Sequence, residues 1–140
     1  MLTGKKVLVI GLARSGKAAV KLLQKLNATI TINEGKELEK IEGYQAYLDA
    51  GIEIVAGGHP DELFERDFDF FVKNPGINYH KLFILRFKER GIPVYTEIEL
   101  AYQVAKKQHY IGVTGTNGKT TTVTLIDKIL KGQYQNVHLA

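Results

Sequence analysis

The fold of this chain is decided by the stretch Val7-Leu8-Val9-Ile10-Gly11-Leu12-Ala13-Arg14-Ser15-Gly16. Its first four side chains are continuous and apolar, which is typical of a strand buried on both faces of a parallel sheet. A glycine-rich turn follows, and a helical pattern of apolar residues then continues to about Asn27. Because a second strand is predicted over residues 29–33, the chain opens with a strand–helix–strand unit.

The same alternation of strand and helix continues along the chain. Short apolar runs predict further strands over residues 52–56, 68–72, 92–95 and 110–114. Apolar side chains at helical spacing predict helices over residues 38–50, 61–66, 79–90, 97–107 and 118–131. This alternation predicts an α/β fold, a doubly wound parallel Rossmann-like sheet in the order 3-2-1-4-5. The strand and helix over residues 110–131 are too few to bury their apolar faces alone, so they must pack on the first domain, pair with another copy or fray. One hypothesis is that the predicted strand 110–114 adds as a sixth parallel strand beside 92–95.

Composition and charge exclude several classes of protein. The chain has 140 residues, a net charge of +4 and 19 scattered basic residues, so we expect attraction for nucleotides and no nucleic-acid surface. It has no cysteine, which excludes a disulfide framework, a cysteine-type zinc site and a thiol nucleophile. No apolar run approaches the roughly 18 residues of a spanning helix, and no signal-peptide pattern is present. We therefore expect a cytoplasmic protein with no membrane partner.

The first glycine-rich turn has the form of a dinucleotide-binding fingerprint in which Ala13 replaces the middle glycine. A middle glycine lets a pyrophosphate approach the backbone closely, and alanine allows a less close approach. At the start of the following helix, a charge and a hydroxyl are available from Arg14 and Ser15. A plain strand-to-helix turn is the alternative. The candidate diphosphate site comprises Gly11, Leu12, Ala13, Arg14, Ser15 and Gly16.

Two further stretches follow predicted strands. Asn33 and Glu34 follow the second strand, where dinucleotide-binding sheets place an acid that reads the ribose. Glu34 is either such an acid or a solvated loop residue. Asn74-Pro75-Gly76 follows the fourth strand and is either a wall of the ligand crevice or a plain turn. The histidines show no metal-ligand spacing, so we interpret them as surface or loop residues: His59, His80, His109 and His138.

A second glycine-rich turn runs through Gly112-Val113-Thr114-Gly115-Thr116-Asn117-Gly118-Lys119-Thr120-Thr121. Backbone N–H groups and the N-terminus of the following helix make such a turn a cradle for phosphate. From this position Lys119 can reach the β- and γ-phosphates of ATP, and the Thr120 hydroxyl can join the shell of Mg²⁺. The generic pattern places a glycine where Val113 stands, and an ordinary turn rich in glycine and threonine is the alternative.

Four stretches together resemble the amino-terminal part of the Mur ligases. They are residues 9–16, Asn74-Pro75-Gly76-Ile77, Thr96-Glu97-Ile98-Glu99-Leu100 and residues 112–121. The last contains Gly115-Thr116-Asn117-Gly118-Lys119-Thr120, which matches the ATP loop that Mur ligases share with folylpolyglutamate synthases. The wider set of stretches separates the two families. The resemblance covers the chain as far as the helix after this loop.

The resemblance implies a UDP-substrate-binding domain over residues 1–96 and the truncated start of an ATP-binding central domain over residues 97–140. The substrate UDP-N-acetylmuramoyl-L-alanine would lie against residues 11–16, Asn33, Glu34 and residues 74–76. Lys119 would be the catalytic residue and Thr120 the Mg²⁺ ligand. The implied ATP-binding residues are Gly115, Thr116, Asn117, Gly118, Lys119, Thr120 and Thr121.

The implied reaction is ATP-dependent amide formation in the synthesis of a peptidoglycan precursor. The substrate carboxylate attacks the γ-phosphate, and the amine of D-glutamate then displaces phosphate from the acyl phosphate. Because members of the family continue through further domains, we expect this chain to be a fragment that is inactive alone. Two alternatives stay open: a nicotinamide-dependent oxidoreductase domain that uses residues 11–16 and Glu34, and a non-catalytic nucleotide-binding module.

Overall fold

The computed structural model describes residues 2–74, 76–77 and 82–139, and within helix α4 (Leu82–Glu89) it describes the side chains from Ile84 onward. The chain forms two compact units, Met1–Lys106 and Lys107–Ala140, and each is described by itself. Helix α5 (Glu97–Val104) packs within the first unit, so the compact boundary follows this helix. The division expected at residue 96 concerns function and stays a prediction.

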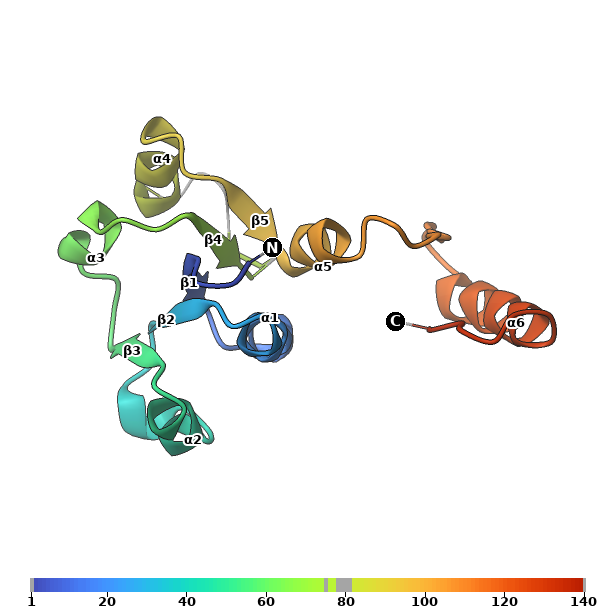
Figure 1. Cartoon of the computed structure of the whole chain (residues 1–140), viewed down its shortest axis with the longest axis horizontal. Helices are drawn as coiled ribbons and strands as arrows, with labels where there is room; N and C mark the ends of the chain where they lie inside the picture. Colours follow the sequence, from blue (N-terminus) through green and yellow to red (C-terminus); the bar gives the residue numbers. More distant parts are fainter. Residues whose placement is uncertain (1, 75, 78–81, 140) are drawn as a thin grey trace. The chain divides into compact units, whose positions relative to one another are not determined.

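The first unit is built on a five-stranded sheet in the order β3-β2-β1-β4-β5 (Figure 1). Every neighbouring pair of strands is parallel. The predicted fold class and strand order are therefore confirmed. Strand order reverses at β1, and in such sheets ligands bind at this switch point, beyond the carboxyl ends of the strands. The strands are β1 (Lys6–Ile10), β2 (Thr29–Glu34), β3 (Glu53–Ala56), β4 (Phe70–Lys73) and β5 (Val94–Thr96).

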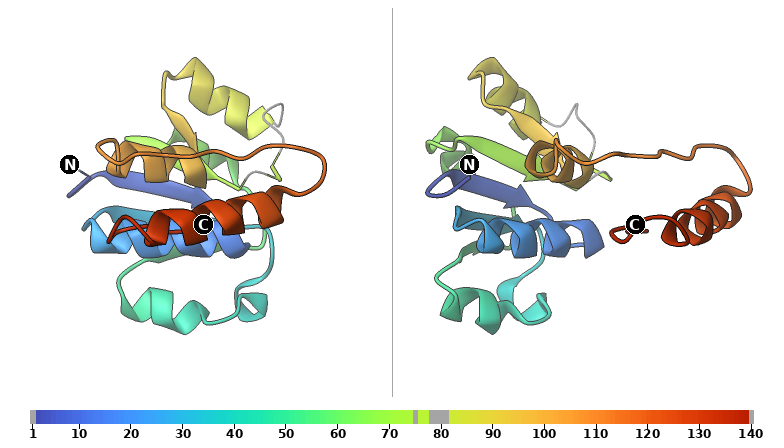
Figure 2. Two further views of the ribbon diagram at one scale, coloured as in Figure 1. Left: turned by 90° about the vertical axis from the view of Figure 1, so that its right-hand side faces the viewer. Right: turned by 45° about the vertical axis from the view of Figure 1, so that its right-hand side comes forward.

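Helices cover both faces of this sheet (Figures 1 and 2). One face packs against α1 (Arg14–Lys25), α2 (Tyr44–Asp49) and α5, and the other packs against α3 (Asp61–Glu65) and α4. Within the described residues, no helix is long and apolar enough to cross a membrane.

Two hydrophobic cores lie between the sheet and these helices. On β1, Val7 and Val9 face the core that contains Leu100 of α5, while Leu8 faces the core that contains Phe87 of α4. All four β1 side chains from residue 7 to residue 10 are 0% exposed, so the continuous apolar run reflects burial on both faces.

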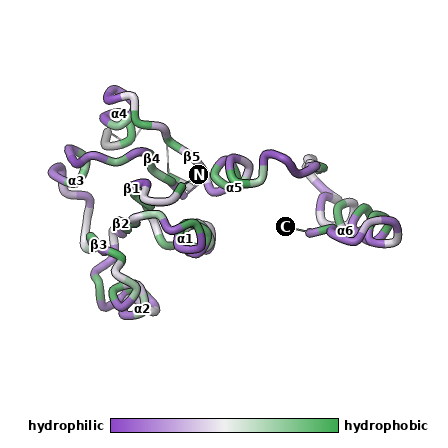
Figure 3. The backbone as a smooth tube through the Cα atoms, in the orientation of Figure 1, coloured by the Kyte–Doolittle hydropathy of each residue, from purple (hydrophilic) through white to green (hydrophobic). Residues whose placement is uncertain are grey.

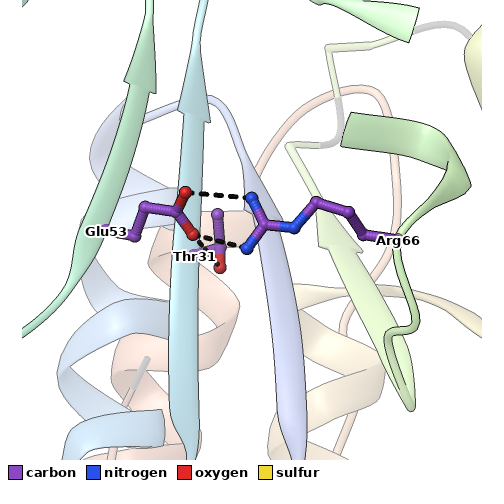
Figure 4. Close-up of polar contacts among 3 residues, drawn as sticks. All are labelled: Thr31, Glu53 and Arg66. Carbon is purple, nitrogen blue, oxygen red and sulfur yellow. Dashed lines mark hydrogen bonds and ion pairs between the residues drawn. The ribbon is translucent and has the colours of Figure 1, made fainter. Parts of the chain in front are cut away.

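A polar cluster ties the end of α3 to the sheet (Figure 4). The guanidinium of Arg66 donates to both carboxylate oxygens of Glu53, at 2.9 and 2.6 Å. The hydroxyl of Thr31, which pairs with Glu53 across β2 and β3, donates to the same carboxylate at 3.1 Å. The hydrogen bond from Arg66 is the main reason why the pKa of Glu53 lies below its ordinary value.

The prediction of one continuous helix over residues 38–50 is wrong, because residues 41–43 are not helical. The chain forms a short 3₁₀ segment, η1 (Leu38–Lys40), and α2 begins only after Gly43. The φ angle of Gly43 is 72°, a left-handed conformation that cannot continue a right-handed helix. Ile41 lies between the two segments and is buried in the first core, which anchors the connection.

The second unit contains helix α6 (Lys119–Lys131), which was predicted, but residues 110–114 are not in a strand. The prediction of a sixth strand is therefore wrong. A strand needs a neighbour for its N–H and C=O groups, and the described residues 107–139 contain no strand to supply one. Figure 3 shows hydrophobic and hydrophilic residues alternating along α6, and the hydrophobic residues Leu125 and Ile129 are largely exposed.

Candidate functional site

Two glycines shape the turn between β1 and α1. Gly11 has a φ angle of +85°, and a Cβ added to it would lie 3.5 Å from the Cβ of Asn74. A Cβ added to Gly16 would lie 1.9 Å from the carbonyl oxygen of Gly11, so a larger residue requires the backbone to move. The N–H of Gly11 donates to the Asn33 carbonyl at 2.9 Å. The turn is thus packed closely between α1, the end of β2 and the segment after β4.

Glu34, at the end of β2, reaches back to this turn. Its Oε2 accepts a hydrogen bond from the Leu12 N–H at 2.7 Å, and its Oε1 accepts one from the Lys36 N–H at 3.3 Å. Carboxylate and phosphate oxygens both accept hydrogen bonds from backbone N–H groups. The contact therefore shows that the Leu12 amide is directed where an anionic oxygen can reach it.

A tight turn follows β4. The Oδ1 of Asn74 accepts a hydrogen bond from the Gly76 N–H at 3.0 Å, and the Asn74 carbonyl accepts one from the Ile77 N–H at 3.0 Å. Lys73 is 2% exposed, and its ammonium donates to the Ile77 carbonyl at 2.8 Å. Burial is the main cause that lowers the pKa of Lys73. The buried ammonium of Lys73 thus holds this turn in place. Pro75, which was predicted to line the site, lies outside the described residues.

These elements border a cavity of about 420 Å³ at the carboxyl edge of the sheet. A concave site with a few polar groups at the switch point of an α/β sheet is where small molecules usually bind. On its wall the ammonium of Lys17 and the carboxylate of Glu42 form an ion pair at 2.7 Å. The lining residues are Ile10, Gly11, Leu12, Ala13, Lys17, Glu34, Gly35, Lys36, Lys40, Ile41, Glu42, His59, Asn74 and Ile77.

The cavity brings together part of the predicted substrate site. Gly11, Leu12, Ala13, Glu34 and Asn74 line it. The other predicted residues that the structure describes lie outside its wall: Gly16 and Asn33 are buried, Ser15 is half-buried, and Arg14 and Gly76 are exposed. Contacts between any of these residues and a ligand stay predictions.

Asn33 is buried in β2, and its side chain connects this strand to β3 and to the loop after β3. Its Nδ2 donates to the carbonyls of Val55 and Gly58 at 3.0 and 2.8 Å, and its Oδ1 lies 2.5 Å from Nδ1 of His59. His59 is an exposed loop residue, as interpreted from the sequence, but its place on the cavity wall was missed. The available signal was its position just after β3, whose end adjoins that of β2.

In the second unit, the side chain of Lys119 folds back over the loop that precedes α6. Its ammonium donates to the carbonyl of Gly115 and, at 3.3 Å, to the carbonyl of Thr116. Gly115 and Gly118 have φ angles of 152° and 74°, conformations that favour glycine. The first N–H groups of a helix have no partners within it, so an ammonium here lies beside donors suited to phosphate.

Thr120 is exposed in the first turn of α6, and its hydroxyl is an oxygen ligand of the kind that Mg²⁺ prefers. The described residues contain no group of three or more His, Cys, Asp and Glu side chains that could hold a metal ion. One hydroxyl fits a Mg²⁺ ion that is held mainly by nucleotide phosphates and water.

Among curated proteins, this chain is similar to UDP-N-acetylmuramoylalanine–D-glutamate ligases. The protein of that name from Streptococcus sanguinis is 51% identical over 132 residues, which are 94% of this chain and 29% of the relative. The chain therefore spans less than a third of the length of this relative. No family model matches the chain.

Two of the solved structures that resemble the chain are ligases 27% identical to it. The first is a pseudomurein peptide ligase type C from Methanothermus fervidus, with a TM-score of 0.60, 27% identity, and coverage of 91% of this chain and 26% of that one. The second is the UDP-N-acetylmuramate-alanine ligase from Thermotoga maritima, with a TM-score of 0.56, 27% identity, and coverage of 91% and 29%. The resemblance to the Mur ligases is thus confirmed, and the oxidoreductase alternative is not favoured.

Proposed function

We propose that this chain is the part of a cytoplasmic ligase that binds UDP-N-acetylmuramoyl-L-alanine and ATP, and that the whole ligase adds D-glutamate to the substrate. The observation that carries the proposal is the cavity at the carboxyl edge of the sheet. It is supported by the 51% identity, over 94% of this chain, to a UDP-N-acetylmuramoylalanine–D-glutamate ligase. Residues 1–96 bind the UDP part in this proposal, and the loop 115–121 binds ATP.

The chemistry of the cavity supports a sugar diphosphate. A diphosphate needs N–H donors and positive charge, and both are available where Leu12 contributes an amide and Lys17 and Lys36 line the wall. Glu34 lies at the end of β2, where an acid binds the ribose in related sheets. A diphosphate that takes the Leu12 amide releases the Glu34 carboxylate for this contact.

The second loop supports the ATP-dependent step. In the proposed reaction the substrate carboxylate attacks the γ-phosphate and ADP leaves; the D-glutamate amine then displaces phosphate from the acyl phosphate. Lys119 neutralises charge on the transferred group. The Thr120 hydroxyl would hold Mg²⁺, which would supply further positive charge to the phosphates.

We further propose that the 140 residues bind both nucleotides without completing the ligation, because the 132 residues that match the relative correspond to 29% of its length. Phosphate release by the purified chain that depends on D-glutamate would contradict this part of the proposal.

Thermal unfolding with UDP, NAD and Mg·ATP, each added separately, tests the proposal. A ligand at a hundred times its dissociation constant adds about 2.7 kcal/mol to the free energy of unfolding, which raises the Tm of a domain of this size by several degrees. We expect UDP to raise the Tm and NAD to leave it unchanged. A shift with NAD alone would support the oxidoreductase, and a shift with ATP alone would support a simple nucleotide module.

The variant Lys119→Ala tests the second loop. We expect it to weaken binding of Mg·ATP at least about tenfold, because the ammonium that faces the phosphates is lost. Calorimetric titration with Mg·ATP measures this change. Lys128→Ala, on the last turn of the same helix, is the matched control and should bind as the unchanged chain does. Equal losses in both variants, or none in Lys119→Ala, would exclude the assigned role.

A further inference from the structure

Lys17 lies on α1, one helical turn after the glycine-rich turn. Its N–H donates to the carbonyl of Ala13 at 3.0 Å, so residues 13 and 17 lie on the same face of the helix. Long side chains in a helix lean toward its N-terminus, which directs the Lys17 side chain back toward this turn and its Leu12 amide. Both Ala13 and Lys17 line the cavity.

Its position separates Lys17 from the other cations of the cavity. Among the described residues, three lysines line the wall: Lys17, Lys36 and Lys40. Lys36 and Lys40 follow β2, beside the position where related sheets bind the ribose. The diphosphate in such sheets lies instead at the turn where the first helix begins. Lys17 is therefore the lysine that belongs to the diphosphate position.

The ammonium of Lys17 is bound by a carboxylate from another segment. It donates to Oε2 of Glu42 at 2.7 Å, which is the length of a charge-assisted hydrogen bond. This bond is the main reason why the pKa of Lys17 is raised and the pKa of Glu42 is lowered. Glu42 directly follows Ile41, which is buried in the first core. The buried neighbour thus anchors the segment that brings the carboxylate to the cavity wall.

A carboxylate also binds the second donor at this position. Glu34 accepts a hydrogen bond from the Leu12 N–H at 2.7 Å. An amide and an ammonium beside the glycine-rich turn therefore each bind a carboxylate of the chain itself. Carboxylate and phosphate oxygens accept from the same donors, so the two contacts mark positions that two phosphate oxygens can take.

We propose that Lys17 binds the diphosphate of the substrate, and that Glu42 competes with the diphosphate for the Lys17 ammonium, so that the ion pair opens when the substrate binds. This inference rests on the proposed function, because it takes the ligand of the cavity to be a uridine diphosphate. The Lys17 and Glu42 side chains are 41% and 89% exposed, and ion pairs this exposed to water are weak. A diphosphate carries more negative charge than one carboxylate, so the exchange favours the ligand.

Two substitutions test the two halves of the inference. Lys17→Met removes the cation and keeps a long side chain, and Glu42→Gln removes the competing charge and keeps the shape. The double variant combines them. Lys21→Met, one turn further along α1 and outside the cavity wall, and Glu39→Gln, an exposed acid in η1, are the matched controls. Calorimetric titration of each 140-residue chain with UDP gives the affinity, and thermal unfolding without ligand reports folding.

We expect Lys17→Met to bind UDP about tenfold more weakly, and Glu42→Gln to bind it roughly two- to fivefold more tightly. Both controls should bind UDP as the unchanged chain does. In the Lys17→Met background, Glu42→Gln should bring no gain, because the ammonium for which the carboxylate competes is absent. A merely structural ion pair predicts the opposite for Glu42→Gln, namely unchanged or weaker binding.

Three results would overturn the inference and leave the proposed function standing. They are full UDP affinity in Lys17→Met, no gain in Glu42→Gln, or an equal gain from Glu42→Gln with and without Lys17. The last result would mean that Glu42 acts only through the general field of its charge. Failure of the unchanged chain to bind UDP would instead overturn the proposed function and the inference with it.

Discussion

At the scale of single residues, the candidate substrate site depends on positions where a side chain does not fit. Gly16 illustrates this, because its added Cβ would lie 1.9 Å from the carbonyl oxygen of Gly11. The Gly11 N–H is in turn bonded to the end of β2. A single atom at Gly16 therefore displaces the backbone that carries the Leu12 amide.

The variant Gly16→Ala should lower the free energy of unfolding by about 2 kcal/mol or more, because a methyl group is forced against backbone. Urea denaturation at neutral pH measures this. Gly35→Ala is the control, since its added Cβ has its nearest neighbour at 3.8 Å, an ordinary van der Waals contact. The steric account of the turn fails if both variants lose the same stability.

Single residues also show what sequence reasoning could and could not reach. The turn at Gly11 and Gly16 could be predicted from the sequence, because a tight turn between a strand and a helix requires small residues at those two positions. His59 carries no such pattern. Its position on the cavity wall depends on the hydrogen bonds of Asn33, which join β2 to β3 and to the loop after β3, segments that are distant in the sequence.

At the scale of elements, the sheet strands were predictable from local patterns. β1, β3 and β4 contain short apolar runs followed by turn residues, and β2 alternates polar side chains with Ile30 and Ile32. The start of α5 also has a local signature. The Thr96 hydroxyl accepts from the Glu99 N–H at 3.3 Å, and the Glu99 carboxylate accepts from the Thr96 N–H at 2.7 Å, which is a capping box. The prediction of a strand at 110–114 was wrong, because a strand needs a neighbouring strand and a local sequence pattern does not show whether one is present.

The cluster of Thr31, Glu53 and Arg66 predicts how stability depends on pH (Figure 4). The folded pKa of Glu53 is lowered from an ordinary value of 4.5, first by its hydrogen bond from Arg66. The resulting stabilisation is therefore complete above the unfolded pKa and is lost as pH falls through the folded pKa. Because both side chains are nearly half exposed, we expect the pair to contribute no more than about 1 kcal/mol.

Glu53→Gln should accordingly unfold more easily than the unchanged chain at pH 7, by roughly 0.5–1 kcal/mol, and the difference should shrink as pH falls below the ordinary pKa of 4.5. Urea denaturation across this pH range provides the comparison. Glu39→Gln, an exposed acid in η1, serves as the control for a change of net charge. A difference that grows as pH falls would have the wrong sign for this account.

At the scale of the whole molecule, the chain carries two candidate anion sites, each where a glycine-rich loop leads into a helix. The first has a cavity, a directed amide and cations on its wall. The second has the Lys119 ammonium folded over its own loop. The first unit has its own sheet and two cores, so the UDP site can be tested by itself.

Amide NMR of the 140-residue chain during titration with UDP tests the central claim most directly. The account predicts that the largest shift changes fall on Gly11, Leu12 and Ala13, with further changes at Glu34 and His59, and that they saturate with added UDP. Unmoved amides in the turn at millimolar UDP, or changes confined to residues 107–139, would contradict a uridine diphosphate site at the carboxyl edge of this sheet.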